Sequence, residues 1–423
     1  MTKKSGAPAI RFKGFSDAWE QRKLGDIADI VGGGTPSTGN QSYWDGDIDW
    51  YAPAEIADQI YANSSQKKIT GLGYENSSAK MLPPGTVLFT SRAGIGKTAI
   101  LTRKGCTNQG FQSIVPHRGE LDSYFIFSRT EELKRYGELV GAGSTFVEVS
   151  GKQMAVMELM MPPTMREQQT IGGFFQQLDN LITLHQRKFE KLTNVKRSML
   201  EKMFPQNGSS YPEIRFKGFT DPWEQRKFGE VFDCTVPNNT LSRVELSYDE
   251  GTVLNVHYGD VLIKYGSVLD VQKDDIPRIP HRCIEDFNGA LLQDGDVIIA
   301  DTAEDETTGK ACEIGNLQGS AIVSGLHTMV CRPRNRMALG YLGCYLNSNA
   351  YHHQLLPLMQ GIKVLSLSRS NIQKTSVSYP SAMKEQQLIA SYFSQLDHLI
   401  TLHQRELEKL QNIKKSMLEK MFV

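Results

Sequence analysis

Apolar residues recur at intervals of seven in two long stretches of the chain, residues 166–204 and 384–422. The repeating positions are Ile171, Leu178, Leu192 and Met199 in the first stretch and Ile389, Leu396, Leu410 and Met417 in the second. Further apolar residues such as Phe175 and Ile182 widen this stripe to about three per heptad, which is typical of a helix that faces a core. Each stretch predicts a helix of 39 residues, on the order of 58 Å long at about 1.5 Å per residue. Such a stripe needs an equally long partner, and the other stretch is the obvious one.

The two stretches are copies of one another, because 27 of their 39 aligned positions are identical. A second repeat opens each half of the chain, at residues 10–27 and 214–231, where 13 of 18 positions are identical. The chain is therefore predicted to run domain, helix, domain, helix. We expect the first domain at 1–165, the first helix at 166–204, a linker at 205–213, the second domain at 214–383 and the second helix at 384–423.

The regions between the repeats share landmarks in the same order although their sequences differ. Residues 83–100 resemble residues 293–314, and short β-branched runs punctuated by glycine recur in both. This pattern favours an α+β fold in which two mostly β domains of one architecture alternate with two long coiled-coil helices. The domains differ most where loops carry specificity.

The helix ends follow from local signals. Thr164 and Glu167 fit a capping box at the start of the first helix, and Pro205 ends it. At the second helix Ala382 replaces the capping threonine, which leaves Ser381 as the alternative cap.

The short linker predicts how the chain folds back. The second helix starts from the second domain, so burying its stripe on the first helix requires the helices to be antiparallel. The predicted molecule has pseudo-two-fold symmetry with a domain at each end, and its C-terminus lies near Ile10. His185 and His403 occupy the same heptad position, where a polar residue more often fixes register than titrates.

Composition narrows the class of protein. Lys plus Arg and Asp plus Glu number 47 each, so any binding to a polyanion depends on local patches rather than on net charge. The N-terminal sequence lacks the apolar core of a signal peptide and no run is long enough to span a bilayer, so we expect a cytoplasmic protein with no membrane partner. The six cysteines are scattered without a C-x-x-C pair, which favours reduced core thiols over zinc ligands or disulfides.

The segment 91–98, SRAGIGKT, invites a comparison with a phosphate-binding P-loop. That motif requires glycine where Ser91 stands, so we set the nucleotide interpretation aside. Two interpretations remain open. The loop presents Arg92, Lys97 and backbone N–H groups to DNA phosphate, or it is a simple hairpin turn with solvated basic residues.

Other signatures of catalysis are missing from the sequence. There is no G-x-S-x-G elbow, no H-E-x-x-H and no dinucleotide fingerprint, and the acidic pairs look like solvated loop charges. We expect no active site and no metal site. For Tyr43 and Trp44 burial in the core competes with contact to a ligand.

Two different β-rich domains on one symmetric pair of helices suggest that each domain recognises a short element of DNA. Asn and Gln pair with adenine and Arg with guanine, so polar loop residues are the candidates. The candidate DNA contacts are Thr35, Ser37, Tyr43, Arg92, Lys97, Asn108, Gln109, Gln112 and Ser144 in the first domain and Asn255, His257, Lys264, Lys310, His327 and Lys363 in the second.

The helices have two expected tasks, pairing with one another and docking other subunits. The candidate residues are Leu178, Ile182, His185, Leu192 and Met199 on the first helix and Leu396, Ile400, His403, Leu410 and Met417 on the second. The polar faces, which include Gln168 and Arg187, are either solvated or free to dock partners. The helices carry net charges of +3 and +1, so neither is a strong DNA-binding stripe.

These features together resemble the specificity subunit of a Type I restriction-modification system. The resemblance rests on the opening segment 10–27, GGGTPSTGNQSYWDGDIDW at 32–50, SRAGIGK at 91–97 and the two EQQ…LITLHQR helices, and it covers essentially residues 1–423. The second domain departs from the pattern, because it lacks the GGTPS and SR-x-x-IGK segments.

The resemblance implies a non-catalytic subunit that binds double-stranded DNA and no cofactor of its own. It implies two methylation subunits that carry S-adenosylmethionine, and two restriction subunits that use ATP and Mg. Each domain is expected to recognise one half of an asymmetric, interrupted target, with half-site centres about one helical turn apart.

Two rival hypotheses come from other classes. A coiled-coil scaffold with protein- or glycan-binding domains predicts no salt-dependent affinity for DNA. A nucleotide-dependent enzyme predicts that Lys97→Ala abolishes an ATPase activity. Neither explains why the helices are nearly identical while the domains diverge, whereas two copies of one partner need two equivalent docking surfaces.

Overall fold

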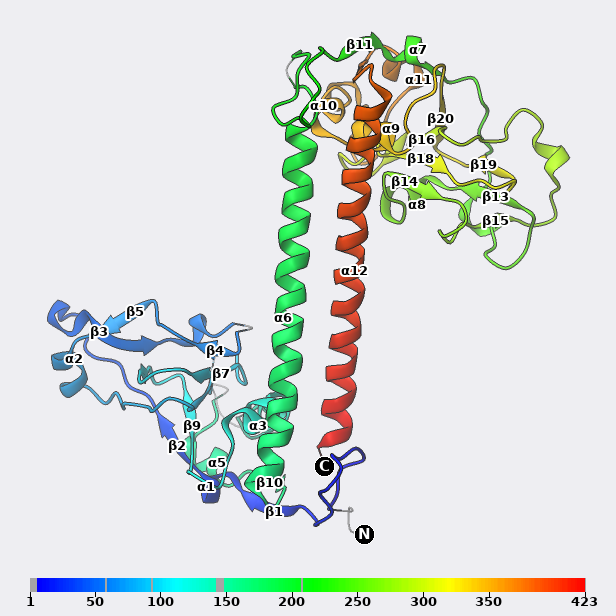
Figure 1. Ribbon diagram of the computed structural model, residues 1–423. Coiled ribbons are helices and arrows are strands. Elements are labelled where there is room, and N and C mark those ends of the chain that lie inside the picture. The colour runs from blue at the N-terminus through cyan, green and yellow to red at the C-terminus, as the bar shows by residue number, and fades with distance from the viewer. Residues whose placement is uncertain (1–5, 58, 93, 142–147, 207, 423) are drawn as a thin grey trace. The chain divides into compact units, whose positions relative to one another are not determined.

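The computed structural model describes residues 6–57, 59–92, 94–141, 148–206 and 208–422. The chain forms two compact units, and each unit takes part of both long helices (Figure 1). Unit 1 comprises Met1–His185 and Glu406–Val423, and unit 2 comprises Gln186–Arg405. We call residues 6–164 head 1 and residues 208–382 head 2.

The long helices are α6 (Met165–Lys202) and α12 (Met383–Met421). In unit 1 the start of α6 packs on the end of α12, where the rings of Phe175 and Phe422 stack with centroids 5.8 Å apart. In unit 2 the start of α12 packs on the residues that end α6, and Phe393 stacks on Phe204 at 5.9 Å. Within each unit the helix segments therefore run antiparallel, which confirms that prediction.

The N-terminal segment of each head is tied to the end of a long helix. The backbone N–H of Ile10 donates to the carbonyl of Lys420 at 2.9 Å in unit 1. The N–H of Ile214 donates to the carbonyl of Lys202 at the same distance in unit 2. The C-terminal end of α12 thus lies beside Ile10, as the connectivity predicted.

The helix starts differ from the predicted caps. Thr164 Oγ1 accepts from the N–H of Glu167 at 3.3 Å, but the Glu167 carboxylate binds side chains of head 1, so the capping box is only half formed. At α12 the N-cap position is held by Ala382 rather than Ser381, and its carbonyl accepts from the N–H groups of Glu385 and Gln386.

Head 1 is built mainly from strands (Figure 1). The strands are β1 (Glu20–Lys23), β2 (Ala28–Gly32), β3 (Trp44–Tyr51), β4 (Tyr61–Ala62), β5 (Lys67–Ile69), β6 (Val87–Phe89), β7 (Thr98–Leu101), β8 (Cys106–Thr107), β9 (Gln112–Pro116) and β10 (Glu158–Met161). The helices are α1 (Leu24–Ile27), α2 (Gly71–Glu75), α3 (Ser123–Ser128), α4 (Thr130–Gly141) and α5 (Gly151–Ala155), with short 3-10 turns η1 (Gln41–Tyr43) and η2 (Pro53–Glu55).

Head 2 repeats this plan. Its strands are β11 (Glu224–Lys227), β12 (Phe232–Asp233), β13 (Val253–Val256), β14 (Val268–Asp270), β15 (Arg278–Ile279), β16 (Val297–Ala300), β17 (Thr302–Ala303), β18 (Ala311–Gly315), β19 (Ile322–Ser324), β20 (Thr328–Pro333), β21 (Leu365–Ser366) and β22 (Ser376–Tyr379). Its helices are α7 (Phe228–Val231), α8 (Tyr258–Ile263), α9 (Tyr341–Leu346), α10 (Asn349–His352) and α11 (Arg369–Ile372), with turns η3 (Arg243–Glu245), η4 (Ile284–Phe287) and η5 (Leu356–Leu358).

The larger and smaller sheets have the same topology in both heads, and head 2 adds the antiparallel pair β17-β21. The larger sheet has the order β2-β9-β6-β7-β4 in head 1 and β12-β20-β16-β18-β14 in head 2. The smaller sheet has the order β5-β3-β8 in head 1 and β15-β13-β19 in head 2. β1 pairs with β10 and β11 with β22, antiparallel in both cases. The α+β class and the shared architecture of the domains are confirmed.

The larger sheet of each head separates two hydrophobic clusters, and a third cluster lies on the smaller sheet. In head 1, Val87 and Phe89 of β6 pack into the core that includes Phe175 of α6, while Leu88 between them packs on the opposite side with Leu101 and Phe111. Head 2 repeats the alternation along β16. Because side chains alternate between the two faces of a strand, one face of the larger sheet packs on the long helices. The smaller sheet lies on the other side of the head.

Candidate nucleic-acid interface

In unit 1 a buried carboxylate joins head 1 to the first turn of α6. Arg11 donates from Nε and Nη2 to the two carboxylate oxygens of Glu167 at 2.7 and 2.8 Å, and Trp19 Nε1 donates to the same carboxylate at 3.2 Å. Glu167 is 1% exposed. A carboxylate this deeply buried requires such partners, so the contact fixes where head 1 leaves the helix.

Unit 2 repeats this junction. Arg215 donates to Glu385 at 2.7 and 2.9 Å, and Trp223 Nε1 donates to the same carboxylate at 3.3 Å. Hydrogen bonding to Glu385 raises the pKa of Arg215, as hydrogen bonding to Glu167 raises that of Arg11. Each head is thus carried on its helix by the same set of side chains.

In head 1 several candidate residues come together on adjoining loops. Gly34 N–H donates to the carbonyl of Thr107 at 2.8 Å, and Ser91 N–H donates to that of Gly110 at 2.8 Å. A Cβ on Gly33 would lie 2.0 Å from the carbonyl oxygen of Asn108, which accounts for glycine there. These contacts bring Thr35, Arg92, Asn108 and Gln109 to one surface, where Thr35 and Gln109 are hydrogen-bonded.

Residues 90–92 and 94–97 connect β6 to β7, which pair antiparallel. Thr90 Oγ1 accepts from Lys97 N–H at 2.9 Å and donates to the carbonyl of Gly94 at 2.7 Å. A P-loop leads from a strand into a helix, whereas this loop leads into a strand. The rejection of a nucleotide site therefore agrees with the fold, and the exposed Lys97 remains available to an anion.

The other candidates of head 1 differ in exposure, and one lies outside the described residues. Ser37 is exposed, and its carbonyl accepts from Trp44 Nε1 at 3.1 Å. Tyr43 and Gln112 are half-buried, and Trp44 packs edge-on against Trp50, in line with the core interpretation. Ser144 lies outside the described residues.

Three candidates of head 2 serve the short helix α8. His257 is its N-cap, with Nδ1 accepting from Gly259 N–H at 3.1 Å, and burial lowers its pKa. Lys310 Nζ donates to the carbonyl of Leu262 at 2.7 Å in the last turn, and burial lowers its pKa also. Lys264 follows the helix and pairs with Asp275 at 2.9 Å. A cation at a helix C-terminus is a common stabilising device, so we remove Lys310 from the interface.

Asn255 is also removed from the candidates of head 2. It is fully buried on β13, and its Oδ1 accepts from Asn239 Nδ2 at 2.7 Å, so it offers no atom to a ligand outside. His327 and Lys363 are exposed and stay candidates. All of these residues were predicted as contacts from their residue type, whereas their burial is set by the tertiary fold.

Head 2 also carries an exposed aromatic site that the sequence did not single out. Tyr248 is 43% exposed, with Lys264 Nζ 4.7 Å from its ring centroid and the Arg243 guanidinium 6.0 Å away. Arg243 is held by the buried Asp260 at 2.6 and 2.7 Å. The carboxylates of Asp260 and Asp275 offset both cations, so this site has little excess positive charge.

Six of the ten predicted pairing residues of the helices lie in or against the cores. Leu178 and Leu396 are buried. Leu410 and Met417 pack on the core of unit 1, and Leu192 and Met199 on that of unit 2. Ile182 and Ile400 line grooves beside the heads, and His185 and His403 stand near the middle of each helix.

Each helix also leaves two leucines exposed that the sequence analysis missed. Leu181 and Leu184 of α6 are 44% and 46% exposed, and Leu399 and Leu402 of α12 are 40% and 44% exposed. The second pair stands at the same repeat positions as the first, 218 residues later. Their recurrence in both copies is the sequence signal that could have identified them.

The comparisons with known proteins agree with this plan. The family model described as the Type I restriction modification DNA specificity domain matches residues 16–194 and 220–412, one match for each head with most of its helix. The chain belongs to this specificity-domain family. The family model matches twice because the chain contains the same unit twice, as the two Arg–Glu contacts between head and helix also show.

Individual relatives of the family match parts or all of the chain. The specificity subunit of the type I restriction enzyme MjaIX of Methanocaldococcus jannaschii is 31% identical over 53% of this chain, and the match spans 54% of that relative. The MjaVIII specificity subunit of the same organism is 20% identical over 95% of this chain and 91% of its own length. The crystal structure of a type I S subunit from M. genitalium matches 99% of both chains, with a TM-score of 0.56 and 13% identity.

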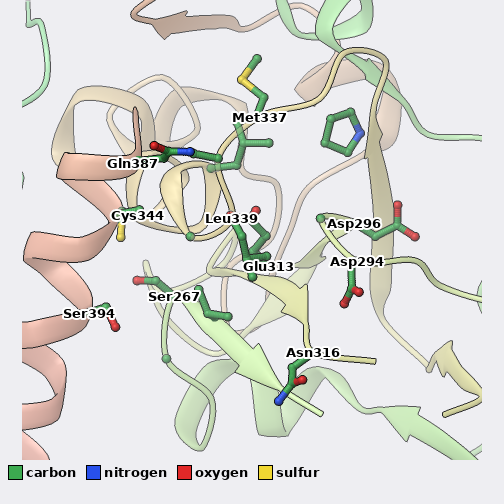
Figure 2. A pocket seen from close by; sticks show the side chains of 18 of the residues that line it. Ser267, Asp294, Asp296, Glu313, Asn316, Met337, Leu339, Cys344, Gln387 and Ser394 are labelled. Atoms are coloured by element: carbon green, nitrogen blue, oxygen red, sulfur yellow. The ribbon is translucent and has the colours of Figure 1, made fainter. Parts of the chain in front are cut away.

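In this specificity-family chain a groove of about 1540 Å³ lies between head 2 and the first turns of α12 (Figure 2). Glu313 on β18 faces the groove but is only 1% exposed, and its Oε2 accepts from Gly343 N–H at 3.0 Å. Burial raises the pKa of Glu313 to about 7 despite the backbone donors. Because this carboxylate is committed to the start of α9, it supports the fold of the head.

Metal and membrane interpretations gain no support from the described part of the chain. It contains no group of three or more His, Cys, Asp or Glu side chains placed to hold a metal. Among the same residues, no helix combines the length and apolar character needed to cross a bilayer. Of the cysteines, Cys283 is exposed, which corrects the expectation that all are core thiols.

Proposed function

We propose that this chain is the DNA-specificity subunit of a type I restriction-modification complex. Each head recognises one half of an asymmetric, interrupted target in double-stranded DNA, and the long helices dock the other subunits. The observation that carries this proposal is the repeat of one head-to-helix junction under two heads with different surfaces. Arg11 with Glu167 and Arg215 with Glu385 hold the heads alike, whereas the loops they carry differ.

The interface proposed for head 1 is the loop surface with Thr35, Arg92, Lys97, Asn108 and Gln109. Its amides and guanidinium have the donor and acceptor pattern that matches adenine and guanine edges in the major groove. In head 2 the proposed contacts are His327, Lys363 and Lys264. Because the two sets share no residue pattern, the two half-sites should differ in sequence.

The helices supply the docking sites in this proposal. An exposed leucine pair recurs on each helix, Leu181 with Leu184 and Leu399 with Leu402. Exposed apolar pairs at a spacing of three fit a helix from a partner subunit. Two equivalent pairs suit two copies of one methylation subunit, and two restriction subunits complete the proposed complex.

In this proposal the methylation and restriction subunits carry out all catalysis. The chain itself is proposed to be non-catalytic, with S-adenosylmethionine bound by the methylation subunits and ATP and Mg used by the restriction subunits. The proposed place of action is the cytoplasm, where the DNA is.

Single-molecule methylation mapping tests the proposal. DNA from cells that express this chain with its methylation subunit is compared with DNA from cells that lack only this chain. The expected result is a bipartite adenine motif, its half-site centres about one helical turn apart, which disappears without the chain. A continuous or palindromic motif contradicts the two-head arrangement. An unchanged methylome with an active methylation subunit favours a scaffold whose heads bind protein or glycan.

A further inference from the structure

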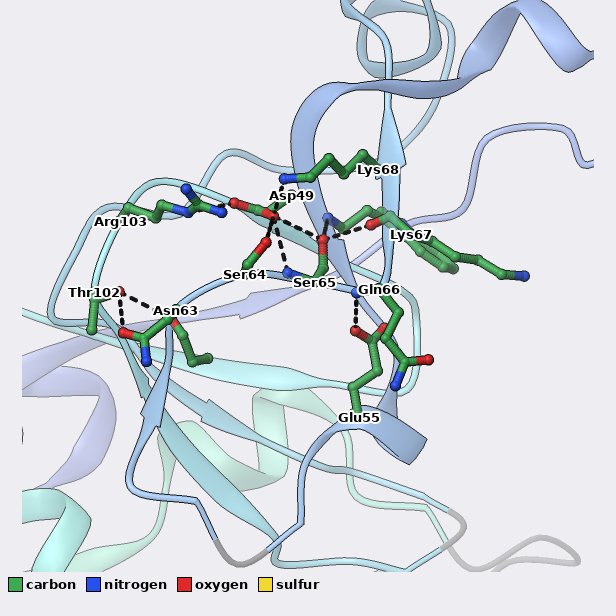
Figure 3. Close-up of polar contacts among 12 residues, drawn as sticks. Asp49, Glu55, Asn63, Ser64, Ser65, Gln66, Lys67, Lys68, Thr102 and Arg103 are labelled. Carbon is green, nitrogen blue, oxygen red and sulfur yellow. Dashed lines mark hydrogen bonds and ion pairs between the residues drawn. The ribbon is translucent and has the colours of Figure 1, made fainter.

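A cluster on the smaller sheet of head 1 holds two basic side chains against one buried carboxylate (Figure 3). Asp49 of β3 is 3% exposed. Lys68 Nζ lies 2.7 Å from its Oδ1, and Arg103 Nε lies 2.7 Å from its Oδ2. The side chains of Lys68 and Arg103 are 32% and 52% exposed, so both reach the surface from their contact with Asp49.

The chain brings these residues together through strand pairing. β5 pairs antiparallel with β3, which sets Lys68 opposite Asp49. β4 pairs parallel with β7, which brings the loop after β4 beside the loop after β7 that carries Arg103. Thr102 N–H donates to the carbonyl of Ala62 at 3.2 Å and closes this contact.

Asp49 is held rigidly and stays ionised. Its Oδ1 accepts from Ser65 N–H and Oγ, both at 3.0 Å, and from Ser64 Oγ at 3.2 Å. Burial by itself raises the pKa of Asp49, but hydrogen bonds from Lys68 and Ser65 outweigh it and lower the pKa to about 2. The carboxylate is therefore a fixed anchor for both cations at any physiological pH.

The balance of charge separates this cluster from an ordinary ion pair. One carboxylate neutralises one cation, yet two converge on Asp49, and their mutual repulsion is a cost that the fold does not need. The exposed Lys104 stands beside Arg103 in sequence and raises the local positive charge further, whereas Lys67 Nζ lies over the Trp44 ring, 6.0 Å from its centroid. Even with Glu55, which accepts from Gln66 N–H, the cluster keeps an excess of positive charge in a chain whose net charge is zero.

From this geometry we infer that Lys68 and Arg103 bind a backbone phosphate of the DNA, with Asp49 as the residue that positions them. The inference rests on the proposed function and adds a contact that positions head 1 without recognising bases. A phosphate oxygen accepts charge-assisted hydrogen bonds from both an ammonium and a guanidinium, and the remaining cationic charge has no other partner of opposite sign in the cluster. In head 2 the equivalent strand pairing, β13 with β15, sets Arg278 opposite Leu254, where head 1 has Lys68 opposite Asp49.

The test uses the full chain assembled with its methylation subunit and two duplexes of equal length. One duplex carries the bipartite motif found by methylation mapping, and the other carries the same bases scrambled. Affinity is measured against salt concentration for the wild type, for Lys68→Gln with Arg103→Gln, and for Lys13→Gln as an exposed control in the same unit.

The expected result is a salt dependence whose slope falls, on both duplexes, by about one for each cation that no longer neutralises a phosphate. Lys13→Gln should leave the slope unchanged. A double variant with wild-type slope and affinity overturns the inference while the proposed function stands. A wild-type complex that does not prefer the motif duplex instead counts against the proposed function.

Asp49→Asn separates positioning from charge. This change makes the cluster more positive by one charge, so attraction by charge alone predicts tighter binding. Release of Lys68 and Arg103 from their anchor predicts weaker binding and a smaller slope. Tighter binding overturns the positioning role. If the double variant unfolds at a lower temperature than the wild type, the single variant Arg103→Gln is used instead, because the Arg103 side chain is half-exposed. An unchanged salt dependence of DNA affinity in that single variant also overturns the inference.

Discussion

The starts of helices α3 and α9 occupy the same place in the two heads but are capped from different sources. In head 1, Asp122 is the N-cap of α3, and its Oδ1 accepts from Phe125 N–H at 2.8 Å. In head 2 the N-cap of α9 is Gly340, 218 residues later, and the carboxylate comes from Glu313 on the neighbouring strand β18. The N–H groups at the start of a helix need a hydrogen-bond acceptor. In head 1 the N-cap residue Asp122 supplies it, and in head 2 Glu313 supplies it from the neighbouring strand.

This difference has a consequence for the strand. β6 pairs Val87 with Ile100 in head 1, and β16 pairs Val297 with Glu313 in head 2, so the carboxylate replaces an apolar core residue. Head 2 therefore carries a buried ionisable group at a position where head 1 has none. By contrast, the junctions to the long helices are the same in both units. The two halves of the chain therefore share the Arg–Glu contact that joins each head to its long helix, whereas the interiors of the two heads differ.

The largest predicted effect concerns the shared junction. Arg11→Ala leaves Glu167 buried without its guanidinium partner, and Arg215→Ala does the same to Glu385. Each change should cost about 3–5 kcal/mol in the free energy of unfolding of its own unit. Hydrogen exchange resolved by segment, measured in increasing guanidinium chloride, checks both values.

The control is Arg22→Ala in unit 1, which breaks an ion pair with Glu120 whose side chains are 38% and 45% exposed. An exposed pair of this kind contributes about 0–1 kcal/mol. If Arg11→Ala costs no more than Arg22→Ala, the junction is not the main attachment of head 1. If the Arg11 and Arg215 variants differ widely, the two junctions are not equivalent.

The second prediction is a pH dependence of unit 2 that arises from Glu313. The pKa of Glu313 is raised by burial to about 7 from an ordinary 4.5, so the folded unit binds a proton that the unfolded chain releases. The stability that Glu313 contributes is complete below pH 4.5 and is lost as the pH rises to about 7. The loss is on the order of 3 kcal/mol.

Glu313→Gln should abolish that loss, because the amide keeps an acceptor and does not ionise. Hydrogen exchange of unit 2 between pH 4.5 and 8, corrected for the intrinsic exchange rate, measures it. Glu306→Gln, an exposed position in the same head, should leave the wild-type profile unchanged. A profile in Glu313→Gln as steep as in the wild type contradicts the assignment.

The third prediction tests the docking leucines and rests on the proposed function. Leu184→Asp changes only unit 1 and Leu402→Asp only unit 2. Each should weaken binding of one methylation subunit by about 2 kcal/mol or more, a loss on the order of thirtyfold. Native mass spectrometry should find one copy bound to each single variant and none to the double variant.

Leu139→Asp is the matched control, because Leu139 is 77% exposed on α4 of head 1 and lies on neither long helix. It should retain both copies. Two copies on the double variant would place the docking surface elsewhere on the helices.

The parts of the fold that rest on periodicity and repetition were predictable from the sequence. The heptad stripe predicted α6 and α12, and the short linker between the halves predicted that these helices are antiparallel. The acceptor at the start of α9 was not predictable from the sequence, because Glu313 lies 27 residues before Gly340 and no local pattern links the two. Candidate contacts chosen by residue type failed where burial decided, as at Asn255. The Asp49 cluster was missed because strand pairing, not spacing, brings Lys68 and Arg103 together.

The smallest predicted effects compare two ion pairs at equivalent positions. Lys414 Nζ lies 2.6 Å from Asp179, whose side chain is 7% exposed and also accepts from Tyr124 Oη at 2.7 Å. Its counterpart pairs Lys196 with Asp397, whose side chain is 35% exposed. Lys414→Met leaves a buried carboxylate with one neutral partner and should cost about 1–3 kcal/mol.

Lys196→Met should cost at most about 1 kcal/mol, because water solvates Asp397 in place of the lysine. Segment-resolved hydrogen exchange on both variants measures the two costs in the units where they arise. Equal costs would mean that the difference in exposure between Asp179 and Asp397 has no energetic weight. If Lys196→Met instead costs more unfolding free energy than Lys414→Met, the partly exposed ion pair of unit 2 is the stronger one. Exposure of the carboxylate would then not predict how much each ion pair stabilises its unit.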